Sequence, residues 1–161
     1  NLELRKIGML IIQDAVWNKV AKNRYKGTKT WYYMDEFHLL LQHEQTAIYS
    51  VEMWKRFRKW NGFPTGITQN IKDLLQTQQI ESIFDNTDFI CMLSQADGDR
   101  EIIMNKKNLS KEQIEYVTNS TEGEGLIIYG KSVLPFKDKF PTDTELFKLL
   151  NTKPSSVKLI K

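Results

Sequence analysis

The residues with the clearest potential for chemistry are Asp35-Glu36, two adjacent carboxylates that directly follow the run Trp31–Met34. Such a run of bulky apolar and aromatic residues is typical of a strand buried on both faces of a parallel sheet. In open α/β sheets, ligands bind outside the carboxyl ends of the strands, which is where these carboxylates would emerge. One carboxylate can join the shell of Mg²⁺ while the other acts on an attacking water, so the pattern indicates nucleotide hydrolysis.

A second polar pair, Thr68-Gln69, ends the next predicted strand, Thr65–Thr68. A long helical region separates the two strands, and a strand–helix–strand unit almost always has a right-handed crossover and parallel strands. The carboxyl ends of both strands then share one edge of the sheet, so Glu36 and Gln69 should reach the same crevice. A glutamine there can hold the lytic water and sense a γ-phosphate. The alternative is a polar turn in which Thr68 or Asn70 caps the following helix.

The crossover helix ends in a basic segment, Lys55–Trp60, in which Arg58 has a distinct position. On a helical wheel, Arg58 lies on the apolar stripe formed by Ala47, Val51 and Trp54. A guanidinium aligned with an apolar face near a helix end either reaches out to solvent or is aimed at a fixed partner. An arginine finger offered to the nucleotide of a neighbouring subunit would fit the second case.

Three other patterns match known motifs by letter but not by context. Gly125–Ser132 satisfies G-x-x-x-x-G-K-[ST], yet its middle residues favour a strand and no helix follows, so Gly130-Lys131 is predicted to be a hairpin turn. Asp35–His38 spells the D-E-x-H of helicases, a match that is common by chance. Asp97–Arg100 resembles an acidic turn but lacks the further ligands of a calcium loop.

Length and composition bound the class of protein. The chain has 161 residues, 40% hydrophobic and 27% charged, which suits one soluble globular domain over residues 1–150 with a loosely ordered tail over 151–161. A formal net charge of +3 is too small to indicate nucleic-acid binding by itself. One cysteine excludes an internal disulfide framework, and no apolar stretch is long enough to span a bilayer.

Hydrophobic periodicity predicts the remaining elements. Residues 3–22 should form a helix whose apolar stripe contains Leu4, Ile7 and Ile11. Ser110 followed by Gln113 resembles a capping box that opens another helix. The other predicted elements are a strand at 89–93, a helix at 111–117, a hairpin of 126–129 and 133–136, and a helix at 144–150.

Together these motifs resemble the conjugative-transfer and type IV secretion ATPases of the VirB-four/TraC type, within the RecA-like P-loop motors. The resemblance covers nearly the whole chain in order, and it implies an α/β fold: a RecA-like P-loop NTPase fragment with a parallel sheet, lacking the Walker A strand, plus a C-terminal hairpin. The matching segments are Trp31–Phe37 as the Walker B strand, Phe57–Trp60 with Gly62, Thr65–Asn70 as the glutamine motif, Ala96–Glu101, Glu122–Leu126, and Phe140-Pro141.

The resemblance also implies a role for each candidate residue, with ATP and Mg²⁺ as cofactors. Glu36 would be the general base on water, Gln69 would sense the γ-phosphate, and Arg58 would be the arginine finger offered in trans. Asp35 would hold Mg²⁺ through water. The residues implied to contact the nucleotide are Asp35, Thr68 and Arg100, the last of which is also a second candidate contact across subunits.

Partners and location follow from the same resemblance. The phosphate loop of the family would precede Asn1, so we expect this chain to be the C-terminal part of a motor ATPase and to be inactive alone. The full-length protein would form a hexamer with itself and contact other channel components at the inner face of the cell membrane, with DNA as a further candidate partner. Two alternatives stay open: a helicase-type nucleic-acid motor, and a non-catalytic docking domain of a secretion complex.

Overall fold

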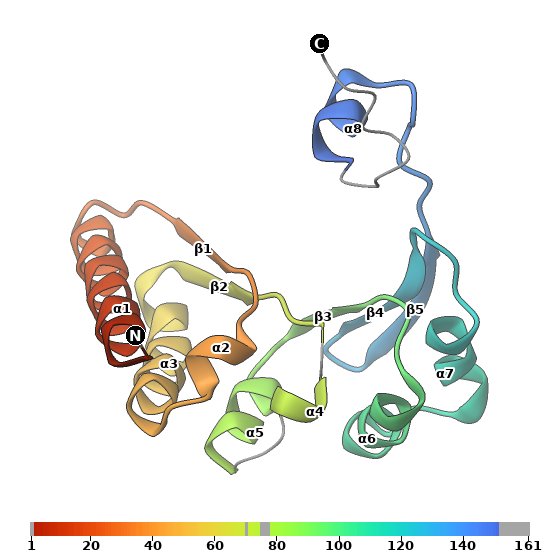
Figure 1. Cartoon of the computed structure of the whole chain (residues 1–161), viewed down its shortest axis with the longest axis horizontal. Coiled ribbons are helices and arrows are strands. Elements are labelled where there is room, and N and C mark those ends of the chain that lie inside the picture. Colours follow the sequence, from red (N-terminus) through yellow and green to blue (C-terminus); the bar gives the residue numbers. More distant parts are fainter. Residues whose placement is uncertain (1, 70, 75–77, 152–161) are drawn as a thin grey trace.

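The framework of the molecule is a pair of small sheets. The structure, a computed structural model, describes residues 2–69, 71–74 and 78–151. One sheet is a parallel pair and the other has three antiparallel strands, and Figure 1 shows the two sheets side by side at the centre. The parallel sheet contains β1 (Thr30–Met34) and β2 (Gly62–Gly66); the antiparallel sheet contains, in spatial order, β3 (Phe89–Met92), β4 (Glu124–Tyr129) and β5 (Ser132–Lys137).

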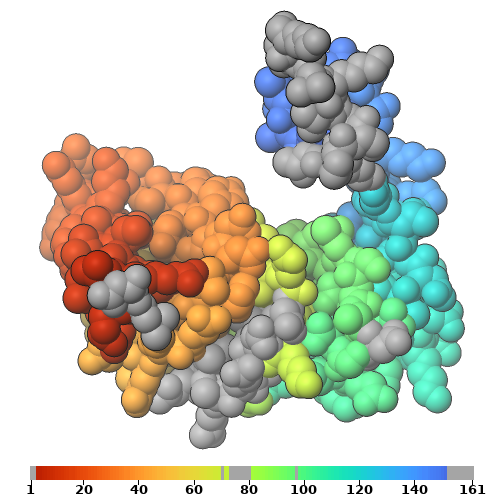
Figure 2. Space-filling model, viewed as in Figure 1, coloured from red at the N-terminus to blue at the C-terminus, as the bar shows by residue number. Residues whose placement is uncertain are grey.

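Helices flank the sheets, except for the last, which stands apart. Figures 1 and 2 show α8 above the antiparallel sheet, with open space between it and the half of the molecule that contains α1 and α3. Within the described residues, no helix is both long and apolar enough to cross a membrane. The helices are α1 (Leu2–Tyr25), α2 (His38–Leu41), α3 (Glu44–Phe57), the 3-10 turn η1 (Arg58–Trp60), α4 (Ile71–Leu74), α5 (Gln78–Asp85), α6 (Asp97–Lys107), α7 (Lys111–Thr118) and α8 (Glu145–Leu150).

The predicted parallel unit is present, but one face of its sheet is open. Met34 is buried and Tyr32 packs against the core beneath the sheet, whereas Trp31 and Tyr33 on the other face are 59% and 63% exposed. Trp31 instead stacks on Phe63 of β2, with 4.3 Å between the ring centroids. The prediction that β1 is buried on both faces is therefore wrong for this chain: the alternation of burial is that of a half-covered strand.

The boundaries of β2 also differ from the prediction. The strand begins at Gly62, four residues before Gly66, because Asn61 adopts a left-handed conformation that ends η1 abruptly. Asn tolerates that conformation better than most residues. The predicted strand at Thr65–Thr68 therefore lies at the end of the real one, and Thr68-Gln69 falls in the loop that follows.

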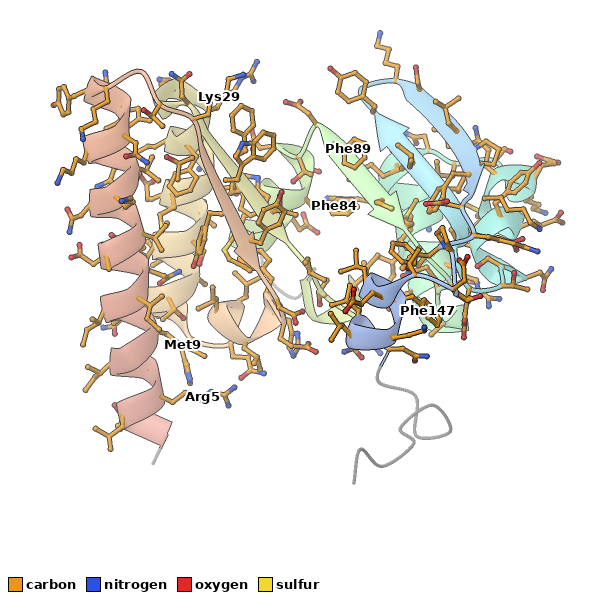
Figure 3. The ribbon with its side chains drawn as sticks, turned by 90° about the horizontal axis from the view of Figure 1, so that it is seen from above. Arg5, Met9, Lys29, Phe84, Phe89 and Phe147 are labelled. Carbon is orange, nitrogen blue, oxygen red and sulfur yellow. The ribbon has the colours of Figure 1, made fainter. Side chains whose placement is uncertain are left out.

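The long first helix is confirmed, but its predicted apolar stripe is not the face that packs. Leu4, Ile7 and Ile11 are exposed, whereas Val20 is fully buried. The contact with α3 includes a buried hydrogen bond of 2.7 Å in which Gln13 Nε2 donates to Ser50 Oγ. Figure 3 shows α1 running alongside α3, with Arg5 and Met9 labelled near its start.

The second half of the chain closes around the antiparallel sheet. Its core contains Met92, Ile103, Val117 and Leu126, which join β3 and β4 to α6 and α7. Both hydrogen bonds of the predicted capping box between Ser110 and Gln113 are present at the start of α7. This half therefore forms around a core of its own, beside the parallel unit.

The predicted hairpin is also confirmed. Gly125–Tyr129 belongs to β4, and Gly130, with φ 57°, begins the turn into β5. The backbone N–H groups of this P-loop-like segment take part in sheet pairing, and they do not form a phosphate-binding loop before a helix. At its base, the Lys137 ammonium pairs with Glu124 and holds the pKa of that carboxyl at about 2.

Candidate functional site

The candidate site lies where β1 and β2 end, toward the centre of the molecule and beside α2 (Figure 1). Backbone pairing continues past both strands: Ile67 N donates to Met34 O, and Phe37 N donates to Ile67 O, each at 2.8 Å. These bonds fasten the loop after β1 to the loop after β2. The polar residues in the two loops are therefore placed by backbone geometry and not by side-chain contacts alone.

Glu36 has an unusual backbone conformation within this arrangement. Its φ is 49°, in the left-handed region that a glutamate rarely adopts. Phe37, the next residue, is only 2% exposed and packs on Trp54 of α3, with 5.4 Å between the ring centroids. The buried ring and the backbone bond of Phe37 thus hold Glu36 in a strained turn, and strain of this kind is concentrated at functional sites.

The predicted meeting of Glu36 and Gln69 is found in the structure. Gln69 Nε2 donates a hydrogen bond of 2.7 Å to Glu36 Oε1. On the other side, His38 Nδ1 lies 3.3 Å from Glu36 Oε2, close enough for an ion pair when the imidazole is protonated. The geometry of this contact is not that of a hydrogen bond, and the buried nitrogen has no hydrogen-bond partner among the residues that the structure describes. Both carboxylate oxygens of Glu36 therefore have a polar neighbour, while its side chain stays 38% exposed.

Asp35 is exposed at the end of β1, and its Oδ1 accepts the backbone N–H of Glu36 at 2.9 Å. No group of three histidine, cysteine or acidic side chains that could enclose a metal ion occurs in the part of the chain that the structure describes. Asp35 nevertheless has the chemistry that Mg²⁺ requires, because this ion prefers carboxylate oxygen and usually keeps several waters and phosphate oxygens in its shell. Asp35 would hold it as one contributor among others.

The other three predicted residues differ in their positions. Thr68 is half-buried beside Gln69, whereas Asn70, its alternative as a capping residue, lies outside the described residues. Arg100 Nε donates to Gln95 O at 3.0 Å and its Nη2 to Thr118 O at 3.3 Å, so it is engaged within the chain. These contacts join the loop after β3 to the end of α7.

Arg58 directly follows the α-helix, which ends at the fully buried Phe57, and it begins the 3-10 turn η1. Arg58 is exposed, which fits the first of the two alternatives for this guanidinium, the one that reaches out to solvent. Arg58 also precedes β2, so it lies at the opposite end of the strand pair from Glu36 and Gln69.

Two polar residues near the site were not predicted to act there. His38 was set aside with the helicase-like letters, yet its imidazole adjoins Glu36. Asp99 belongs to the acidic turn, yet it is buried and its carboxylate reaches α4. A signal for His38 was present, because a residue two positions after a strand-end carboxylate can fold back on it. No sequence signal placed Asp99.

No protein-family model and no curated protein matches this chain. Among solved structures it is similar to VirB4 of Thermoanaerobacter pseudethanolicus, with a TM-score of 0.77 and 24% sequence identity over 88% of the present chain. The match covers 38% of the VirB4 chain, so the present chain spans less than half of that length. The likeness shows that the fold is the one found in that part of VirB4, which confirms the fold class predicted from the sequence.

Proposed function

We propose that this chain supplies the water-activating part of an ATP-hydrolysing motor of a type IV secretion or conjugative DNA-transfer system. The observation that carries the proposal is the 2.7 Å contact between Glu36 and Gln69, which come from the ends of two neighbouring parallel strands. The fold shared with VirB4 supports the class of motor.

The proposed roles follow from the chemistry of each group. Glu36 takes the proton of the attacking water, and Gln69 holds that water or the γ-phosphate of ATP by its amide. Asp35 would help to hold Mg²⁺, an ion that would supply neutralisation of the charge on the phosphates. Thr68 lies beside Gln69, where its hydroxyl can contact the nucleotide. The contact between Gln69 and Glu36 would have to open when ATP enters, because both groups are then needed by the substrate.

The arginine finger is assigned to Arg58 and not to Arg100. Arg100 is committed to two backbone carbonyls of its own chain, whereas Arg58 is exposed. Under this proposal the full-length protein works as an oligomer, with Arg58 contacting the nucleotide of the neighbouring subunit. It contacts other components of a secretion channel at the inner face of the cell membrane, and the transported substrate is DNA or protein.

The proposal is tested by Glu36→Gln in the full-length protein. The variant should bind ATP as the parent does, whereas turnover should fall at least ~10²-fold, the scale of a lost general base. Glu112→Gln is the matched control, because Glu112 is an exposed glutamate in α7 that belongs to none of the matched segments, and it should leave turnover unchanged. Retained turnover in Glu36→Gln would remove Glu36 from the role. Hydrolysis that depends on added nucleic acid would favour the helicase-type alternative, and normal DNA transfer by Glu36→Gln would favour the docking domain.

A further inference from the structure

Asp99 is an acidic side chain in an unusual environment. It lies in the first turn of α6 and is only 7% exposed, although acidic residues are almost never buried without a partner. Its Oδ1 accepts the backbone N–H of Lys72 at 3.2 Å. Lys72 belongs to the first turn of α4, where backbone N–H groups have no partner inside the helix. Asp99 therefore acts as a helix cap supplied by a different helix.

The capped helix α4 begins at Ile71, two residues after Gln69. Ile71, the first residue of α4, is buried in the core formed with Met92 and Ile103. On the other side of Gln69, the N–H of Ile67 is bonded to Met34 at the end of β1, and its carbonyl to Phe37 in the loop that follows. Gln69 thus lies between two fixed points, and Asp99 together with Ile71 provides the second one.

Asp99 is itself fixed from the other side. Its backbone N–H donates to Ala96 O at 3.1 Å, and the adjacent Arg100 binds the carbonyls of Gln95 and Thr118. The Asp99 carboxylate therefore connects the antiparallel half of the molecule to the loop of Gln69.

We infer that Asp99 is a positioning residue for Gln69: by capping α4 it fixes the chain next to Gln69 and so keeps the Gln69 amide beside Glu36, within reach of the water or the γ-phosphate. The inference rests on the proposed function, in which Gln69 contacts the water or the γ-phosphate. Asp99 thus has a role in the Asp97–Arg100 turn that the sequence pattern alone does not predict.

The first test is a double-mutant cycle in the full-length protein. Asp99→Ala should lower kcat ~10-fold or more at an unchanged KM for ATP, because small misplacements of a catalytic group are costly. In a Gln69→Ala background, Asp99→Ala should cause no further loss, since the group that it positions is gone. Asp99→Asn keeps an acceptor oxygen and should stay within about threefold of the parent, as the hydrogen bond is retained in weaker form. Equal losses in both backgrounds, or an Asn variant as impaired as the Ala variant, would overturn the inference.

The matched control is Ser110→Ala, which removes the side-chain cap of α7. This variant also removes a side-chain oxygen that accepts a backbone N–H in the first turn of a helix, in the same half of the molecule. Its kcat should not change. An equal fall of kcat in Ser110→Ala would mean that loss of a cap acts only through general stability. Should Asp99→Ala not accumulate as folded protein, Asp99→Ser replaces it, because the hydroxyl ends short of the position of the carboxylate oxygen.

A second measurement separates failure of this inference from failure of the proposed function. Hydrogen exchange of peptides that cover residues 67–74, followed by mass spectrometry without ATP, should become faster in Asp99→Ala and stay unchanged in Ser110→Ala. Faster exchange supports the positioning even where Gln69→Ala proves fully active, a result that would overturn the role of Gln69 instead. Unchanged exchange in Asp99→Ala overturns the positioning, whatever the turnover numbers are.

Discussion

At the scale of single residues, the chemistry of the candidate site depends on a conformation that its sequence disfavours. Glu36 has φ 49°, a conformation that costs an ordinary residue about 1–2 kcal/mol. The neighbouring backbone bonds of Phe37 and Ile67 keep it there. A position that only needed to be exposed could hold glycine or asparagine with less strain. The presence of a glutamate is therefore best explained by what its carboxylate does.

Because of its positive φ, Glu36 should respond to a glycine substitution differently from a glutamate in a helix. Glu36→Gly should be as stable as the parent or slightly more stable. Glycine adopts positive φ freely, and this relief of backbone strain offsets the roughly 0.5–1 kcal/mol that glycine loses in conformational entropy on folding. Glu101→Gly, in the regular helix α6, should lose about 1 kcal/mol. Denaturant unfolding of the two variants makes the comparison. A loss in Glu36→Gly as large as that in Glu101→Gly would show that the turn at Glu36 is not strained.

At the scale of elements, the site depends on close packing between the loop after β1 and the strand β2. A Cβ placed on Gly66 would lie 2.6 Å from Phe37 Cδ1, and Phe37 is the residue that anchors Glu36. Gly66 is not in the left-handed region, so the demand at this position is for space alone. Glycine at the end of β2 is thus a packing requirement of the neighbouring loop.

Gly66→Ala should therefore destabilise the protein by about 1–3 kcal/mol, the usual cost of overpacking. Gly8→Ala is the matched control, because Gly8 is in the helix α1 and no atom outside that helix, among the described residues, lies within 4 Å of the added methyl group. That variant should gain about 0.5–1 kcal/mol from helix propensity. Thermal unfolding of both variants measures the two effects, and a Gly66→Ala variant as stable as Gly8→Ala would mean that Phe37 can move without cost.

The elements also show which parts of the site sequence reasoning could reach. The meeting of Glu36 and Gln69 was predictable, because parallel strands and a right-handed crossover leave their following loops at one edge. The change from α-helix to 3-10 turn at Arg58 was not, because it occurs at a single residue, although the exposure of Arg58 fits one of the two alternatives given by the helical wheel. The position of Asp99 was not predictable either, since it results from the packing of α6 against α4, and the same acidic letters suit a solvent-exposed loop.

At the scale of the whole molecule, the residues with proposed catalytic roles lie at the two opposite ends of the parallel strand pair. Glu36 and Gln69 follow the carboxyl ends of β1 and β2, whereas Arg58 precedes the amino end of β2. A five-residue strand is roughly 16 Å long, so the length of the sheet separates Arg58 from the site of its own chain. Under the proposed function, an exposed arginine at that distance would contact the nucleotide of a neighbouring subunit and not that of its own chain. In a ring of identical subunits, each chain would then offer its Arg58 end to the Glu36 end of the next.

The last prediction follows from this geometry and concerns mixed oligomers of the full-length protein. Arg58→Ala alone should lose turnover ~10³-fold or more, the scale of a missing arginine finger, and Glu36→Gln alone should also be inactive. A mixture of the two should recover part of the activity, because an Arg58→Ala subunit keeps its own Glu36 and receives Arg58 from a Glu36→Gln neighbour. Lys59→Ala, which removes the adjacent exposed cation, should behave as the parent. If Arg58 acts within its own chain, every subunit of the mixture lacks either Arg58 or Glu36. A mixture that stays as inactive as its components would therefore contradict the action of Arg58 on the nucleotide of a neighbouring subunit.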